Sequence, residues 1–170
     1  MKAKLIVDNR EIEVEISEEE LNKIKNKTGY ERATCPGTKL WFENYGRVEE
    51  YNDSLDFPYD VLYNCANYYS SRDVAGNNIR ADKLMRQLRR FAVENRKHSL
   101  NWEIDNNQRK YSIYYGTSNL FEEPELKIDC CFEDRYFGII YFDTREAAQK
   151  AIETFYDELI WYFTEYKDSL

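Results

Sequence analysis

Few residues in this chain of 170 can act as soft metal ligands or as catalytic nucleophiles. It has one histidine, His98, and four cysteines, and no two cysteines are spaced as a Cys-x-x-Cys pair. A structural zinc site takes four Cys or His ligands, usually at such short spacings, so a zinc site is not expected. We expect His98 to lie at the C-terminal end of a helix, where its positive charge would complement the helix dipole. The sequence therefore predicts no catalytic residue, no cofactor and no metal centre.

Glycine and long apolar runs are also scarce. The six glycines are scattered and form no phosphate-binding loop, and the nucleophile-elbow, zinc-protease and Walker motifs are absent. No run of 18 apolar residues could form a membrane-spanning helix, and the first residues lack the apolar core of a signal peptide. The four cysteines, Cys35, Cys65, Cys130 and Cys131, are then read as reduced thiols of a cytoplasmic protein.

What the chain has in abundance is charge, and the charge is segregated. There are 32 acidic and 24 basic residues, for a net charge of −8. The segment 80–97 reverses this balance, with seven cations against two acids. The cations are Arg80, Lys83, Arg86, Arg89, Arg90, Arg96 and Lys97. Opposite fields on one small protein can bind polyanionic and cationic partners on different faces, so these seven residues are the predicted binding site.

Three interpretations of this basic helix stay open. The cations could be a solvated face, or they could bind phosphates next to aromatic rings that stack on bases. They could also neutralise acidic groups of the same chain or of a second copy. Arginine outnumbers lysine five to two, which favours specific bidentate contacts with carboxylate or phosphate groups.

Two acidic groups offer weaker chemistry. The carboxylates of Asp53, Asp56 and Asp60 could hold a divalent cation, but their spacing is not that of an EF-hand and favours a solvated turn. A second group comprises Asp129, Glu133 and Asp134, with Lys127 nearby. Carboxylates with a lysine at a strand end are typical of metal-dependent nucleases, and this activity is kept as a remote alternative.

The hydrophobic pattern predicts an α+β fold. The expected architecture is an antiparallel sheet of about four to six strands packed against two long helices. An N-terminal β-hairpin (3–7 and 11–16) followed by a short capped helix forms a predicted appendage, residues 1–34, before a core domain of residues 35–170. Further strands are expected at 39–44, 47–49, 102–104, 110–115, 126–132 and 137–142, and the long helices at 73–98 and 145–167.

The last helix is apolar on more than one side. Ala148, Ile152 and Leu159 belong to a regular core stripe, whereas Ile160, Trp161 and Phe163 lie off it. A helix with a second apolar side is either deeply buried or meets a partner. These last three residues are therefore the predicted interface of a homodimer.

Several segments of the chain, taken together, carry a family resemblance. They are Glu11-Ile-Glu-Val-Glu-Ile-Ser-Glu-Glu-Glu-Leu21, Lys39-Leu-Trp41-Phe, Gly46-Arg-Val48, Asn67-Tyr-Tyr, Ala81-Asp-Lys-Leu84, Trp102, Lys110-Tyr-Ser-Ile-Tyr-Tyr115, Phe137-Gly-Ile-Ile-Tyr-Phe142, Thr144-Arg-Glu-Ala-Ala-Gln-Lys-Ala-Ile152 and Leu159-Ile-Trp-Tyr-Phe163. In these segments the chain resembles small accessory proteins encoded by bacteriophages and prophages of Firmicutes. The similarity extends over nearly the whole chain and is best near the C-terminus.

This resemblance implies a function without assigning catalytic residues. Such families are similar to phage genes that antagonise host defence, including anti-CRISPR proteins. The implied role is a non-enzymatic inhibitor in the bacterial cytoplasm that occludes a surface of a defence protein or ribonucleoprotein complex, with RNA or nucleotide contact through the basic helix as an option. A nucleotide-binding sponge for immune signalling molecules is the alternative.

Overall fold

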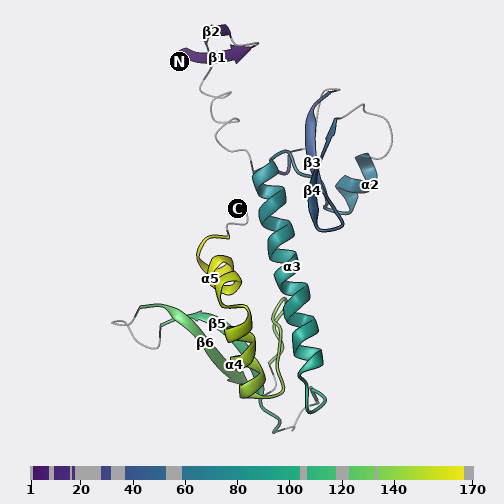
Figure 1. Cartoon of the computed structure of the whole chain (residues 1–170), viewed down its shortest axis with the longest axis vertical. Coiled ribbons are helices and arrows are strands. Elements are labelled where there is room, and N and C mark those ends of the chain that lie inside the picture. Colours follow the sequence, from purple (N-terminus) through teal and green to yellow (C-terminus); the bar gives the residue numbers. More distant parts are fainter. Residues whose placement is uncertain are drawn as a thin grey trace. The chain divides into compact units, whose positions relative to one another are not determined.

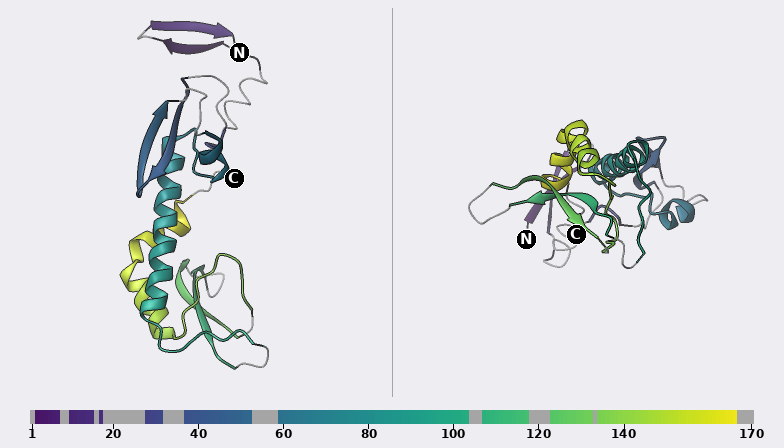
Figure 2. Two further views of the ribbon diagram at one scale, coloured as in Figure 1. Left: turned by 90° about the vertical axis from the view of Figure 1, so that its right-hand side faces the viewer. Right: turned by 90° about the horizontal axis from the view of Figure 1, so that it is seen from below.

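The computed structural model describes residues 2–7, 10–15, 17, 28–31, 37–52, 59–103, 107–117, 123–132 and 134–166, and Figures 1 and 2 show their secondary structure. Two compact units meet within one helix, with the division between Gly76 and Asn77. The boundary predicted at 34/35 and the short helix predicted before it lie outside the described residues.

Unit 1 contains two antiparallel hairpins and a short helix. Their bounds are β1 (Lys2–Val7), β2 (Arg10–Glu15), β3 (Lys39–Asn44), β4 (Arg47–Asn52) and α2 (Tyr59–Asn64). The N-terminal hairpin is confirmed, and its register places Leu5 opposite Ile12. Tyr45 and Gly46 connect β3 to β4, and both have positive φ, at 50° and 78°. Such a two-residue turn matches the twist of the strands that it joins.

The segment after α2 continues the hydrogen bonding of β3. The backbone N–H groups of Trp41 and Tyr69 each donate to the other residue's carbonyl oxygen at 2.9 Å. Two residues further along β3, the Asn67 side chain takes the place of a strand backbone: its Nδ2 donates to the Glu43 carbonyl and its Oδ1 accepts from the Glu43 N–H. These bonds hold Tyr68 against Leu40 in a small buried cluster.

Glu31 joins the segment 28–31 to the start of the next helix. Its carboxylate accepts hydrogen bonds from the backbone of Thr28 and Gly29 and from the Ser70 hydroxyl. Gly29 has φ +88°, and a Cβ there would lie 2.5 Å from Cγ2 of Val74, so only glycine fits. Partial burial by itself would raise the pKa of Glu31, but hydrogen bonds from Ser70, its own backbone and Thr28 lower it from 4.5 to about 2.

Glu31→Gln should destabilise the protein at neutral pH by about 1–2 kcal/mol, because the anion accepts charge-assisted hydrogen bonds. A carboxyl group whose folded pKa is depressed contributes stability above its unfolded pKa, and this contribution disappears as pH falls from about 4.5 to 2. Urea unfolding at pH 7 and at low pH should therefore show a difference between variant and wild type that narrows with acidity. The matched control is Glu50→Gln, in an exposed ion pair with Lys39, which should change stability little. An equal loss at both pH values would contradict the role given to the anion.

Unit 2 contains one hairpin and the helices that form its core. Its elements are most of α3 (Arg72–Glu94), β5 (Lys110–Gly116), β6 (Glu125–Cys131), α4 (Arg145–Thr154) and α5 (Tyr156–Thr164). Helix α4 packs on the β5–β6 hairpin, as Figures 1 and 2 show. The buried core of the unit comprises Leu84, Leu88, Ala92, Phe142, Ala147, Ala148, Ala151, Ile152 and Leu159. The apolar faces of α3, α4 and α5 thus contribute to one core.

The α+β class is confirmed, but the predicted single sheet is wrong. In the described part of the chain each sheet has two strands. The segment 137–142 contributes only one bridge, in which Phe142 and Tyr111 exchange backbone hydrogen bonds of 2.8 and 2.9 Å. Gly138, at φ +80°, turns the chain away from an extended path, and the described residues 102–103 form no strand.

The second predicted long helix is also wrong, because it breaks at Phe155. There φ is −118° and ψ is 23°, and α4 ends before α5 begins. The Phe155 ring packs edge-on against Phe91 of α3, with centroids 5.6 Å apart. At the start of α4 the Thr144 hydroxyl accepts a hydrogen bond from the Ala147 N–H at 3.2 Å and so caps the helix. Among the described helices, none has the length and apolar composition needed to cross a bilayer.

Candidate binding surface

The outward face of α3 carries five of the seven cations predicted as a binding site. Arg80, Lys83, Arg86, Arg89 and Arg90 are exposed, whereas the opposite face of the helix is buried in the core. The helix ends at Glu94, so the other two predicted cations, Arg96 and Lys97, lie in the connection that follows it and are also exposed.

Part of this charge is used within the chain. The Arg80 guanidinium makes two hydrogen bonds with the Glu158 carboxylate, at 2.8 and 3.2 Å, and its carbon lies 3.9 Å from the centroid of the Trp161 ring. Arg90 pairs with Glu94 one turn away at 2.7 Å. Arg86 has an interaction of its own as well. The interpretation of the basic helix as an intramolecular partner of acidic groups therefore holds for two of its arginines, Arg80 and Arg90.

Four cations remain available to a partner. The side chains of Lys83, Arg89, Arg96 and Lys97 make no ion pair or hydrogen bond within the described residues. An arginine without an ion-pair partner can still form a bidentate pair with a carboxylate or a phosphate.

The connection after α3 is fixed by a buried carboxylate. Oδ2 of Asp143 accepts hydrogen bonds of 2.7 Å from the backbone N–H groups of Lys97 and His98. Its second oxygen is buried and has no partner among the described groups. His98 lies four residues beyond the end of α3, so the predicted interaction of its side chain with that helix dipole is wrong.

The segment 134–141 presents apolar side chains to solvent. Phe137 is fully exposed, and Tyr136 and Ile139 on either side of the turn are also exposed. The base of the segment is held in place, because the Tyr141 hydroxyl accepts from the Tyr136 N–H at 2.8 Å. We call residues 134–141 the aromatic loop.

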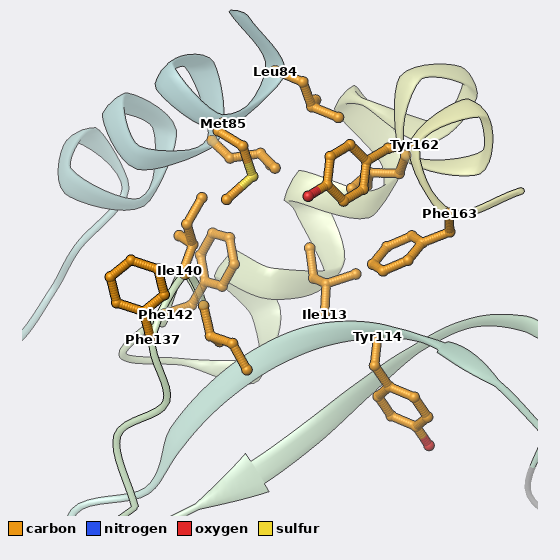
Figure 3. A pocket seen from close by; sticks show the side chains of 13 residues that line it. Leu84, Met85, Ile113, Tyr114, Phe137, Ile140, Phe142, Tyr162 and Phe163 are labelled. Atoms are coloured by element: carbon orange, nitrogen blue, oxygen red, sulfur yellow. The ribbon is translucent and has the colours of Figure 1, made fainter. Parts of the chain in front are cut away.

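An apolar pocket opens beside the aromatic loop. Its volume is about 380 Å³, and its walls come from α3, β5, α5 and the loop (Figure 3). The lining residues are Leu84, Met85, Leu88, Ile113, Tyr114, Phe137, Gly138, Ile139, Ile140, Phe142, Leu159, Tyr162 and Phe163. Figure 3 shows the Tyr162 hydroxyl directed into the pocket and the Tyr114 hydroxyl directed away from it. The pocket is therefore apolar with one inward polar group, a composition common in ligand sites.

A second hollow lies against the same loop and is cationic. Arg89, Arg135 and Tyr136 line it together with Phe137, Gly138 and Ile139, the three residues that it shares with the apolar pocket. Its volume is about 480 Å³. We call it the cationic hollow. The Arg135 guanidinium is held near the Trp102 ring, 5.4 Å from its centroid.

Sequence reasoning found Arg89 but missed Arg135 and the aromatic loop. The strand predicted at 137–142 would bury alternate side chains, and the sequence gives no prediction for Arg135. The available signal was Gly138 among large apolar residues, because a glycine inside a strand pattern often marks a bend or a bulge.

The predicted interface residues differ in exposure. Trp161 is only 7% exposed and is covered by Arg80 and Tyr166 of its own chain. Ile160 is half-buried. Phe163 is exposed, stacks on Tyr115 with ring centroids 6.0 Å apart, and lines the apolar pocket. The homodimer stays a prediction, and Phe163 is the residue that can test it without disturbing the core.

If a homodimer forms through this face, Phe163→Glu should convert it to monomer, because burying an unpaired carboxylate in an apolar interface is costly. Size-exclusion chromatography with light scattering measures the mass directly. The control is Tyr156→Glu, an exposed aromatic on the same helix outside the predicted set. A wild-type protein that is monomeric even at high concentration would contradict the predicted homodimer.

Neither acidic group gains support as a metal site. The described residues contain no cluster of three or more His, Cys, Asp or Glu side chains that could hold an ion. Asp53, Asp56, the Asp60 side chain and Glu133 lie outside the described residues. Lys127, proposed to assist a nuclease, lies 3.4 Å from the Glu125 carboxylate.

Cys65, Cys130 and Cys131 carry free thiols. Burial raises the pKa of the Cys131 thiol, and the positive charge of nearby Lys110 opposes this shift only in part.

No protein-family model matches the chain, and the searches found neither a similar curated protein nor a similar solved structure.

Proposed function

We propose that the chain is a non-enzymatic binding protein, encoded by a bacteriophage or prophage, that antagonises a bacterial defence system by covering a surface of one of its components. The observation that carries this proposal is the exposed aromatic loop with an apolar pocket on one side and a cationic hollow on the other. Soluble proteins rarely leave such apolar groups exposed together unless a partner covers them. Aromatic residues, methionine and arginine are also the side chains enriched in protein interfaces.

The phage origin and the defence target derive from the resemblance of the sequence to phage accessory proteins. An anti-CRISPR-like inhibitor fits that origin and needs no chemistry of its own. It has only to bind a defence protein or ribonucleoprotein complex in the bacterial cytoplasm more tightly than the natural nucleic acid or substrate does.

Two routes to such binding follow from the segregated charge. The acidic majority of the chain could occupy a cationic channel in place of nucleic acid, or the cationic side chains of unit 2 could bind an acidic protein patch or RNA. Both routes are electrostatic, so affinity should fall as salt rises between about 50 and 500 mM. An affinity that does not change with salt concentration would contradict both routes of binding.

The test uses bacteria in which a defence system destroys incoming phage or plasmid DNA. Expression of the full chain should restore phage plaques or plasmid establishment, and the tagged chain should co-purify with a component of that system in a stoichiometric complex. Turnover of any nucleic acid or nucleotide by the purified protein would overturn the non-enzymatic assignment. A panel of defence systems in which neither protection nor capture occurs would overturn the anti-defence role.

A nucleotide-binding sponge is the second candidate, and the cationic hollow is the observation that favours it. Arginines for phosphates and an aromatic ring for a base lie together at Arg89, Arg135 and Phe137. Calorimetry with linear and cyclic nucleotides tests this directly. Micromolar or tighter uptake would support the sponge, and absence of heat with the whole panel would exclude it.

A further inference from the structure

We propose that the apolar pocket and the cationic hollow form one docking site for a protein segment in which a large apolar side chain is flanked by carboxylates. The apolar side chain would enter the pocket, and the carboxylates would pair with Arg89 and Arg135. This inference rests on the proposed binding function and specifies the chemistry of the partner.

The pocket is already formed in the unbound chain. Its deepest residues, Leu84, Phe142 and Leu159, belong to the buried core of unit 2 and are at most 3% exposed. Core residues are held by close packing, so the floor of the pocket needs little reorganisation when a partner binds. Met85 and Phe163 stand at its sides, and the flexible thioether of methionine adapts to different apolar shapes.

The lining selects an apolar occupant. A volume of about 380 Å³ is at the lower end of the range for ligand pockets, roughly 300–1,000 Å³. Apart from the Tyr162 hydroxyl, the side chains that line it are hydrocarbon, the phenol of Tyr114, which points away, and one thioether. A nucleobase carries hydrogen-bonding edges that such walls would leave unpaired, which disfavours its burial there. A leucine, methionine or phenylalanine side chain carries none.

The charge beside the pocket selects the residues next to that side chain. The cationic hollow shares Phe137, Gly138 and Ile139 with the pocket, so the two lie on either side of the same three residues. Within the described residues, Arg89 has no side-chain partner, and Arg135 makes a cation–π contact with Trp102 and no ion pair with a carboxylate. Both guanidinium groups can therefore form bidentate pairs with acidic residues of the partner.

Phe137 is the third element of the site. Its ring is fully exposed on a turn that Gly138 shapes with a positive φ. Covering an exposed phenylalanine side chain removes a large apolar surface from water, so this ring can act as an interface hot spot. The site thus combines one projecting aromatic ring, one apolar pocket and two arginines. A peptide segment that crosses the aromatic loop with apolar and acidic residues next to each other would contact all of them.

Selection from a displayed library of random dodecapeptides on the immobilised full-length protein tests the chemistry without knowledge of the natural partner. The enriched peptides should contain a large apolar residue with Asp or Glu within two positions. A synthetic peptide of the enriched sequence should bind in fluorescence anisotropy, with affinity that falls when its acids are replaced by their amides. Enrichment of basic or purely apolar peptides, or of none, would overturn the proposal.

Single substitutions on exposed positions then locate the site. Arg89→Glu and Phe137→Ala should each weaken binding of the selected peptide by at least about tenfold, because each removes a main contact without affecting the core. Lys83→Glu is the matched control, since it reverses one charge on the same helix but lines neither hollow. It should weaken binding less than about threefold, through long-range charge alone. Equal losses for Arg89→Glu and Lys83→Glu would contradict a defined site.

The same variants separate this inference from the proposed function. If a defence component is captured by the wild type and equally well by Arg89→Glu and Phe137→Ala, the docking site is wrong while the binding function stands. If a labelled single-stranded RNA or a nucleotide binds and is lost in Phe137→Ala, the occupant is a nucleic acid or nucleotide and the acidic segment is wrong. If the wild type captures nothing and protects against nothing, the proposed function itself fails.

Discussion

Phe142→Ala should destabilise the protein by about 3–5 kcal/mol, the usual cost of removing a fully buried aromatic ring. The ring is 1% exposed and belongs to the main core of unit 2. It also forms part of the floor of the apolar pocket, so truncation would enlarge an existing hollow. The backbone bridge to Tyr111 would remain, but it would no longer be covered by the side chain. Urea unfolding followed by circular dichroism measures the loss.

The control for this prediction is Val93→Ala, which shortens an exposed side chain on α3. Its effect should stay within about 0.5 kcal/mol. A Phe142→Ala protein that loses less than about 1 kcal/mol would show that the core can collapse around the site, which close packing against the helices argues against.

Lys110→Ala should destabilise the protein by about 2–4 kcal/mol through two separate effects, loss of packing and loss of hydrogen bonds. Lys110 is 0% exposed, although it is charged. Its ammonium group donates to the carbonyl oxygens of Gln108, at 3.1 Å, and Phe132, and lies 4.8 Å from the centroid of the Trp102 ring. Truncation would leave both carbonyls without this donor and open a cavity under the indole.

Lys110→Met separates the two effects, because methionine keeps the volume and removes only the charge and its hydrogen bonds. We expect it to lose about half as much stability as Lys110→Ala, since it also avoids the burial of a charge. Urea midpoints of the two variants give the comparison. A Lys110→Ala protein as stable as wild type would mean that the ammonium group and its carbonyl partners are better solvated than their burial indicates.

Local patterns in the sequence predicted local structure well. The N-terminal hairpin predicted at 3–7 and 11–16 and the strands predicted at 39–44 and 47–49 are present, because short strands and tight turns depend mainly on neighbouring residues. Leu84, Leu88 and Ala92, spaced four residues apart in the basic helix, lie on its buried face. Thr144 caps the helix that follows it for the same local reason.

The wrong predictions concern features that depend on contacts between residues far apart in the sequence. Ile160, Trp161 and Phe163 fall off the stripe of a continuous helix, and we took them as a second apolar face. After the break at Phe155, Leu159 packs into the core of unit 2, whereas Trp161 lies on another side of α5 and is covered by Arg80 and Tyr166. These contacts, and the packing of Phe155 against Phe91, join residues that are far apart in the sequence.

The candidate site was predicted in part. The cations of α3 stand out in the sequence because charge is a property of each residue. The apolar pocket could not be found in this way, since its walls come from residues 84–88, 113–114, 137–142 and 159–163, which only the tertiary structure brings together. The tertiary structure also decides which cations form ion pairs within the chain. Arg80 pairs with Glu158, whereas Lys83, on the same helix, has no partner among the described residues.

The division between the two units falls inside α3, and this limits how the protein can be cut. A fragment that began at Asn77 would start within a helix and would expose four backbone N–H groups that are bonded in the intact chain. A helix deprived of its first turn also has to nucleate afresh at the new end. Dissection of the two halves for crystallography or spectroscopy should therefore begin the C-terminal fragment before Arg72, and linker insertion at the division should act as a helix-breaking lesion rather than as a neutral spacer.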